Sequence, residues 1–139
     1  MIRRAEAKDI PEIVKIEDSS FGMPWPDFMF KAHLSNPGFV VYESEGRVLG
    51  YAMVGDEDGI AHLMSIAVDP KYRRQEVGSK LLEWCLDTLV MYGYHKVSLE
   101  VRVSNVAAQE FYLARGFKKE KIVEAYYIDE DAIVMGREF

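Results

Sequence analysis

The chain has 139 residues, a length that suits one domain and leaves little room for two separate cores. Apolar residues make up 49% and charged residues 29%, which indicates a packed core rather than disorder, and the net charge of −6 argues against nonspecific binding to nucleic acid or an anionic membrane. No apolar run approaches the ~18 residues that span a bilayer, and the polar start is unlike a signal peptide. A single cysteine, Cys85, can form neither an intramolecular disulfide nor a zinc site. We therefore expect one soluble, cytoplasmic domain over residues 1–139.

The first third of the chain predicts one short strand and two helices. Residues 2–5 have the character of a strand. A helix is expected to begin at Asp9, because Pro11 lies in its first turn and Glu12 follows three residues later, as in a capping box. A second helix is expected over residues 27–35.

The middle of the chain predicts three consecutive strands and a long helix. Residues 39–43, 48–55 and 60–68 are separated by short turns, which is typical of an antiparallel meander. From Gly78 onward, apolar residues recur at helical spacing, and Gly93 suits the position just after the end of that helix.

The last third predicts a strand, a helix and a final strand pair. Residues 96–103 alternate between apolar and polar side chains, and a helix is expected over residues 106–114. The final strands are expected over residues 118–124 and 132–136. The resulting fold class is a mixed, mainly antiparallel α/β sheet, flanked by about four helices and containing a strand–helix–strand crossover.

The most informative segment is the one between the third strand of the meander and the long helix. The strand ends at Asp69-Pro70, a basic loop with Arg73 and Arg74 follows, and Lys80 lies in the first turn of the helix. Backbone N–H groups at a helix N-terminus, together with the helix dipole, suit an anion such as a pyrophosphate. By itself, the segment fits a simple turn with solvated charges equally well.

The whole chain resembles the GNAT acetyltransferase superfamily, whose cofactor motif is Arg/Gln-x-x-Gly-x-Gly/Ala and aligns here with residues 73–78. More narrowly, it resembles the ribosomal-protein and archaeal N-terminal acetyltransferases. The segments that carry this likeness are residues 21–26, 65–70, 99–105, 111–117 and 126–135. Glu76 stands where the family normally has the first motif glycine, and a positive φ at that position would strain a glutamate.

This resemblance implies acetyl-CoA as cosubstrate, no metal, and direct attack of an amine on the thioester without an acyl-enzyme. Cys85 fits that chemistry, because it falls at a core position of its helix and is interpreted as inert. The residues that the resemblance places against acetyl-CoA are Ile66, Ala67 and Val68 along the pantetheine arm, Arg73, Arg74, Gln75, Glu76, Val77, Gly78 and Ser79 around the pyrophosphate, and Asn105 further along.

Three residues are catalytic candidates. Glu100 matches the family's proton acceptor, against the alternative of a surface carboxylate paired with Arg102. Tyr112 matches the proton donor, against core packing; because a tyrosine pKa near ~10 exceeds a thiol's near ~8.5, its role is better described as a hydrogen bond to the departing thiolate. His62 is a second base candidate. The equal alternative is that His62 is simply a half-exposed residue of a strand with no catalytic role.

By the same resemblance, two loops are expected to frame a slot for a peptide end: Phe21, Met23 and Trp25 in one, Tyr126 and Tyr127 in the other. Packing is the competing interpretation for one of the tyrosines. The function implied is acetylation of protein N-terminal α-amines, on ribosomal proteins or general nascent chains. Two alternatives remain, a small-molecule amine or lysine acetyltransferase on the same fold, and a noncatalytic CoA-binding module.

Overall fold

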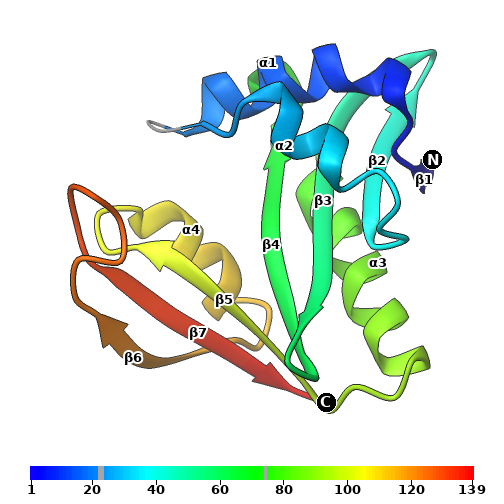
Figure 1. Cartoon of the computed structure of the whole chain (residues 1–139). Helices are drawn as coiled ribbons and strands as arrows, with labels where there is room; N and C mark the ends of the chain where they lie inside the picture. The colour runs from blue at the N-terminus through cyan, green and yellow to red at the C-terminus, as the bar shows by residue number, and fades with distance from the viewer. Residues whose placement is uncertain (22–23, 74) are drawn as a thin grey trace. The chain divides into compact units, whose positions relative to one another are not determined.

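The computed structural model describes residues 1–21, 24–73 and 75–139. The elements in chain order are β1 (Ile2–Arg4), η1 (Ala7–Asp9), α1 (Ile10–Ser20), α2 (Asp27–Ala32), β2 (Phe39–Ser44), β3 (Arg47–Glu57), β4 (Ile60–Val68), η2 (Pro70–Tyr72), α3 (Val77–Met91), β5 (Lys96–Arg102), α4 (Val106–Leu113), β6 (Lys118–Val123) and β7 (Ala132–Glu138) (Figure 1). Within these described residues, seven strands pair in the order β1-β2-β3-β4-β5-β7-β6. The β4–β5 pair is parallel, and the pairs β1–β2, β2–β3, β5–β7 and β6–β7 are antiparallel. The predicted mixed α/β sheet is therefore confirmed.

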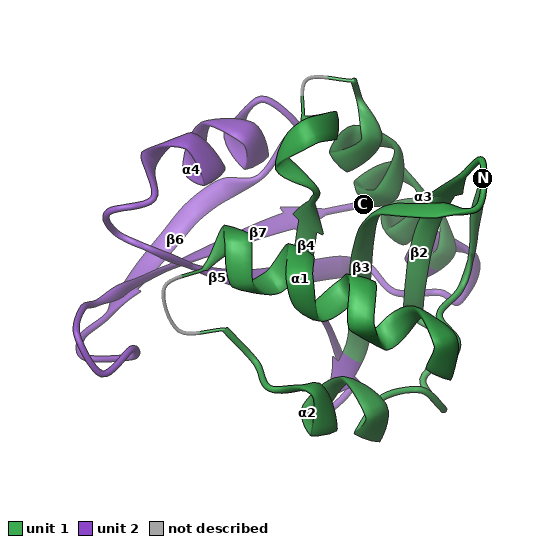
Figure 2. Ribbon diagram, turned by 90° about the horizontal axis from the view of Figure 1, so that it is seen from above, with its two compact units in different colours: residues 1–55, 63–88 green, residues 56–62, 89–139 purple. Residues whose placement is uncertain are grey.

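The chain forms two compact units (Figure 2). Unit 1 comprises residues 1–55 and 63–88, and unit 2 comprises residues 56–62 and 89–139. The core of unit 1 contains an aromatic cluster in which Phe30 and Phe39 lie edge-on to Tyr51, with ring centroids 5.6 and 6.4 Å away. Ile13 of α1 packs in the same core. Burial of these large side chains is the main stabilising term for the unit.

The core of unit 2 follows from the alternation of β5. Val97, Leu99 and Val101 are buried, whereas the side chains between them are half-exposed. Because successive strand residues point to opposite faces, β5 has one apolar face and one polar face. The predicted pattern is confirmed, although the strand ends at Arg102 rather than at residue 103.

The start of α1 differs from the predicted capping box. Asp9 precedes the helix, but its carboxylate accepts hydrogen bonds from the Glu6 amide at 2.8 Å and from Arg3 at 2.8 and 2.9 Å, and makes no side-chain cap on α1. Glu12 instead accepts from the Val48 amide of β3 at 3.0 Å. The prediction was wrong because a buried carboxylate near a guanidinium gains more from that bidentate, charge-assisted pair than from a local cap.

The second helix is also shorter than predicted, ending at Ala32 instead of residue 35. The Asn36 side chain accepts from the Gly38 amide at 2.8 Å and donates to the Val54 carbonyl at 3.1 Å, so the chain turns early toward β2. The end of α3 was predicted correctly: Gly93 has φ +85° and follows the helix closely.

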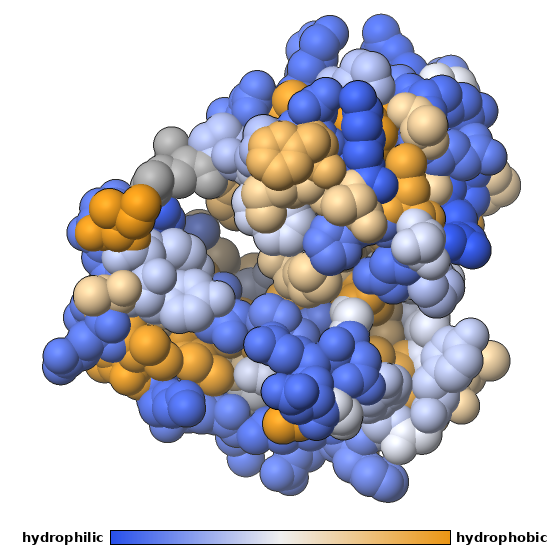
Figure 3. Space-filling model, viewed as in Figure 1, coloured by the Kyte–Doolittle hydropathy of each residue, from blue (hydrophilic) through white to orange (hydrophobic). Residues whose placement is uncertain are grey.

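The surface carries mainly hydrophilic side chains, with small separate apolar patches on the face in Figure 3. The most exposed large apolar residues are Ile128 at 90% and Met91 at 84%. Among the residues that the structure describes, no helix has both the length and the apolar composition needed to cross a bilayer.

Candidate functional site

The two base candidates of the sequence are in direct contact. His62 of β4 and Ser98 of β5 are register partners in the parallel pair, which brings His62 to the polar face that also carries Glu100. The His62 Nε2 atom lies 2.5 Å from the Glu100 Oε2 atom. Both side chains are about one-fifth exposed, 19% and 21% respectively, so the pair is shielded from bulk water but reachable by a ligand.

A second carboxylate contacts the same imidazole. The Glu57 Oε2 atom lies 3.5 Å from His62 Nδ1, on a side chain that is 73% exposed. The hydrogen bond to Glu100, opposed by burial and helped by the charges of both carboxylates, raises the pKa of His62 above its usual value. Because a carboxylate accepts and does not donate, Nε2 carries the hydrogen in this contact. Nδ1 is then the nitrogen that gains or loses a proton.

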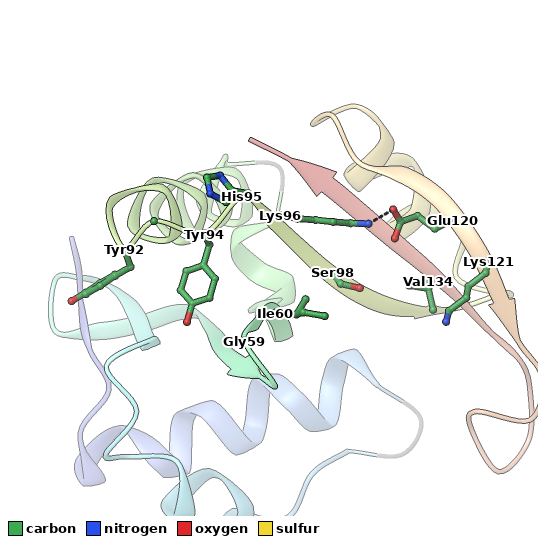
Figure 4. A pocket seen from close by; sticks show the side chains of 11 residues that line it. Gly59, Ile60, Tyr92, Tyr94, His95, Lys96, Ser98, Glu120, Lys121 and Val134 are labelled. Atoms are coloured by element: carbon green, nitrogen blue, oxygen red, sulfur yellow. Dashed lines mark hydrogen bonds and ion pairs between the residues drawn. The ribbon is translucent and has the colours of Figure 1, made fainter.

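A pocket of about 540 Å³ opens on unit 2 beside this pair. Ser98, the register partner of His62, lines it together with Ile60 and Tyr94. Lys96 and Glu120 form an ion pair of 2.5 Å across its wall (Figure 4). This pocket was not predicted, because its lining runs from Gly59 to Val134 and includes residues of β4, β5, β6 and β7, which spacing along the chain does not bring together.

The loop between β6 and β7 holds the two candidate substrate tyrosines next to each other. Tyr126 and Tyr127 form an edge-to-face pair with centroids 5.0 Å apart, and the Arg102 guanidinium lies 4.2 Å from the Tyr127 centroid. Desolvation raises the pKa of Tyr127 to about 12 and also raises that of Tyr126. Tyr126 remains 49% exposed. The packing interpretation therefore suits Tyr127, and Tyr126 is the more accessible of the two.

This loop is fixed to the end of β5 by charge. Arg102 donates to Asp129 at 2.6 Å and to Glu130 at 3.1 Å. Glu130 also accepts from the Ser104 amide at 3.0 Å and from the Ser104 hydroxyl at 2.9 Å. The hydrogen bonds of Arg102 therefore join it to the loop, and not to Glu100 as in the alternative considered from the sequence.

The helix α4 positions two further candidates. Asn105 is its N-cap, and the side-chain oxygen accepts from the Ala108 amide at 3.1 Å. Tyr112 is 8% exposed and packs edge-on against Phe111 and Phe117, with centroids 5.3 and 5.4 Å away. The packing role of Tyr112 is thus present, and a catalytic role for its hydroxyl would act in addition to it.

The candidate anion loop lies in unit 1. Arg73 donates from Nε to the Val68 carbonyl at 3.3 Å and from Nη2 to the Ser20 hydroxyl at 3.2 Å, which braces the loop against the end of α1. Glu76 has φ +63° and an exposed side chain. The family's glycine position is therefore a left-handed one here as well, and the glutamate adopts it with strain. Arg74 lies outside the described residues.

The first turn of α3 follows directly. Its first hydrogen bond runs from the Lys80 amide to the Glu76 carbonyl at 3.0 Å, so the predicted anion-binding amides Val77, Gly78 and Ser79 all belong to the opening turn. Gln75 precedes them and is exposed. At the end of β4, Ala67 is buried while Ile66 and Val68 are half-buried.

The other candidate substrate loop also belongs to unit 1. Phe21 and Trp25 pack against its core, and the Trp25 ring lies 5.6 Å from Phe30 and 5.8 Å from His33, centroid to centroid. Met23 lies outside the described residues.

No cluster of metal ligands accompanies these groups in the part of the chain that the structure describes. Cys85 is 1% exposed, and burial raises the pKa of its thiol to about 12, which agrees with its interpretation as inert.

Comparison with known proteins decides the family. The pattern of the acetyltransferase (GNAT) family matches residues 10–117. The chain belongs to this family. It is 36% identical to an N-alpha-acetyltransferase of Sulfurisphaera tokodaii over 96% of this chain and 90% of that protein. Two solved structures are also similar. Ard1 from Thermoplasma volcanium has a TM-score of 0.94 and 30% identity, over 99% of this chain and 96% of that chain. The ribosomal-protein-S18-alanine N-acetyltransferase from Escherichia coli has a TM-score of 0.87 and 33% identity, over 99% of this chain and 92% of that chain.

Membership of the GNAT family makes the protein an N-acetyltransferase and confirms the predicted fold class and enzyme class. Sequence reasoning did not find the roles of Glu57 and Glu17. Glu17 had a visible signal, because it occupies a position four residues after Ile13 on the apolar side of α1, where the helical period calls for an apolar residue. Glu57 had none: it ends β3 in the structure, but the acidic segment of residues 56–59 has the composition of a turn.

Proposed function

We propose that this GNAT protein, acting as one domain over residues 1–139, transfers the acetyl group of acetyl-CoA to the N-terminal α-amine of proteins, ribosomal proteins and nascent chains included. The observation that carries the proposal is the His62–Glu100 contact of 2.5 Å on the polar face of β5, a proton acceptor built from two half-buried groups. The names of the relatives support the acceptor class, because the protein from Sulfurisphaera tokodaii is an N-alpha-acetyltransferase and that from Escherichia coli a ribosomal-protein-bS18-alanine N-acetyltransferase.

The residues present fit acetyl-CoA. The opening turn of α3 supplies backbone N–H groups and the positive end of a helix dipole, which suit the pyrophosphate. Glu76 has an exposed side chain and a positive φ, so the departure from the family motif is accommodated at a conformational cost. Ile66 to Val68 and Asn105 would hold the rest of the molecule. When bound, acetyl-CoA supplies the thioester carbon that the amine attacks.

The His62–Glu100 pair would take the proton from the attacking amine. With the His62 Nε2 hydrogen donated to one oxygen of Glu100, the other oxygen is the proton acceptor, directly or through a water. When Nδ1 is protonated as well, the imidazolium forms an ion pair with the Glu100 carboxylate, which opposes transfer of the amine proton to it. The reactive form is therefore the one with neutral His62, and the two base candidates of the sequence act as one unit rather than as rivals.

Tyr112 would donate a hydrogen bond to the departing thiolate. Its ring is already fixed by Phe111 and Phe117, so little side-chain entropy is lost on binding. Full proton transfer from a phenol of pKa ~10 to a thiolate of pKa ~8.5 is uphill by about 2 kcal/mol, which favours stabilisation by hydrogen bonding over complete transfer.

Protonation arithmetic favours an α-amine as the acceptor. An α-amine with a pKa near ~7.8 is about one-seventh neutral at pH 7, whereas a lysine amine near ~10.4 is neutral in about one molecule in 2,500. A modest base such as a half-buried carboxylate is sufficient for an α-amine but is a poor catalyst for a lysine amine. Tyr126 and Trp25 are the aromatic groups that we propose to hold the peptide end.

The test is acetyl-CoA turnover on matched peptides, one with a free N-terminus and no lysine, the other N-terminally blocked and carrying one lysine. We expect a strong preference for the free N-terminus, and a library varied at the first two residues then defines the preferred sequence. Equal rates would favour the small-amine or lysine alternative. Acetyl-CoA binding without turnover on any amine would favour the noncatalytic module.

A further inference from the structure

The most deeply buried acidic group of α1 plays no part in the mechanism above. Glu17 is 4% exposed, and desolvation raises the pKa of its carboxyl group. A buried carboxylate is costly unless its oxygens are fully hydrogen-bonded. An aliphatic residue at this position on the apolar side of α1 would avoid the cost of burying a carboxylate. The groups that Glu17 binds therefore indicate its role.

Glu17 joins three separate segments of unit 1. Its Oε2 atom accepts from the Trp25 amide at 2.8 Å, and its Oε1 atom accepts from the Tyr51 hydroxyl of β3. Since the Tyr51 hydrogen goes to Glu17, Ser65 of β4 donates to the Tyr51 oxygen, at 2.9 Å. The network thus links the segment just before α2 to β3 and then to β4.

Both ends of this network lie at predicted ligand contacts. Trp25 belongs to the segment that we propose to hold the acceptor peptide, and its ring is packed against Phe30 and His33. Ser65 immediately precedes Ile66, the first residue of the strand segment proposed to follow the pantetheine arm. A displacement of the Trp25 backbone would therefore change the acceptor side, while β4 stays fixed by its pairing in the sheet.

We propose that Glu17 is a positioning residue for the acceptor peptide: its carboxylate anchors the Trp25 backbone to β3 and β4 and so sets where Trp25 lies. This inference rests on the proposed function, because it assigns a role toward that same acceptor. The alternative is a polar cluster that stabilises unit 1 and has no specific effect on the acceptor.

A double substitution separates the two roles. In Glu17→Met with Tyr51→Phe, the carboxylate and the hydroxyl are both replaced by apolar groups of similar shape, a change that is often nearly neutral for stability. The Trp25 amide nevertheless loses its acceptor. Tyr51→Phe alone retains the Glu17–Trp25 bond. Glu17→Gln also retains it, since the amide oxygen can accept from Trp25 while the amide nitrogen donates to the Tyr51 oxygen.

The measurements are steady-state kinetics with a peptide of free N-terminus, and calorimetry of acetyl-CoA binding. We expect the double variant to raise the peptide KM about tenfold or more, the scale of one lost buried hydrogen bond, with acetyl-CoA affinity within about twofold of wild type. Glu17→Gln should keep the wild-type KM, and Tyr51→Phe, which removes the link to β3 but keeps the Trp25 bond, should raise the peptide KM less than the double variant does. Glu12→Met is the matched control, because Glu12 on the same helix also accepts one backbone hydrogen bond, from Val48.

The inference is overturned if the peptide KM of the double variant equals that of Tyr51→Phe, or if peptide and acetyl-CoA affinities fall together. Glu17→Gln behaving like the double variant would also overturn it, because charge rather than position would then matter. If the double variant does not fold, Glu17→Met alone provides the same comparison. A wild-type protein that acetylates no peptide overturns the proposed function itself, a result distinct from all of these.

Discussion

Replacing Glu100 by glutamine removes the proposed proton acceptor while retaining the shape of the site. The amide can still accept from His62 Nε2, so the 2.5 Å contact is kept in altered form and the fold is not disturbed. Loss of a general base costs about 10–10⁴-fold in rate. The variant can react only with amines that are already neutral, about one-seventh of the α-amines at pH 7, so raising the pH should recover up to about sevenfold of the loss.

The assay is kcat/KM for a free N-terminal peptide from pH 6 to pH 9.5, measured for wild type, Glu100→Gln and Glu57→Gln. The third protein is the matched control, because Glu57 contacts the same imidazole at 3.5 Å but is 73% exposed and screened by water. We expect Glu57→Gln to lose less than about threefold. A deficit of Glu100→Gln that does not change with pH would mean that Glu100 positions substrate, and equal losses in both variants would refute the assignment of the base.

The same profile tests the role of His62. Its pKa is raised, chiefly by the hydrogen bond to Glu100, so the protonated and inactive form should persist to higher pH than for an ordinary histidine. The wild-type rate should rise with pH as His62 loses its proton. In Glu100→Gln the carboxylate that raises the His62 pKa is absent. The part of the pH–rate profile that reports loss of the His62 proton should therefore move to lower pH.

Two further substitutions test the cofactor loop and the thiolate contact. Glu76→Gly should stabilise the protein by about 0.5–1 kcal/mol in thermal unfolding, because glycine adopts φ +63° without strain, and should leave acetyl-CoA binding unchanged or tighter by calorimetry; weaker binding would show that the Glu76 side chain contributes to the site. Tyr112→Phe should lower kcat with little change in the KM for acetyl-CoA, because the ring contacts with Phe111 and Phe117 are kept; full activity would leave Tyr112 with packing alone.

The elements of the fold could be predicted because their signals are local. The alternation of β5 and the glycine after α3 depend on side-chain period and on φ at single residues, and both were confirmed. The start of α1 could not be predicted in the same way. Asp9 has the sequence context of a cap, but its carboxylate is bound by Arg3 of β1, and a pair across a strand end and a turn matches no helical capping pattern.

The candidate site shows the same division between local and distant signals. His62 and Glu100 were each identified separately, by likeness to the family, yet their contact depends on the register of two parallel strands that are 38 residues apart at these positions. Glu17 was missed although its polar character breaks an apolar pattern, because its partners Trp25 and Tyr51 are fixed only by the tertiary fold.

Three carboxylates of this chain illustrate why exposure and bonding together determine what an acidic residue can do. Glu57 is too exposed and too well hydrated to be more than an electrostatic influence on His62. Glu17 is fully buried and has each oxygen engaged by a donor of the fold, so it can hold a backbone but cannot easily receive a proton from a substrate. Glu100 lies between these extremes: one oxygen is bound to His62, and the side chain remains 21% exposed. A proton acceptor for a peptide amine must be shielded from bulk water and still open enough to be reached, and of the three, Glu100 alone meets both conditions.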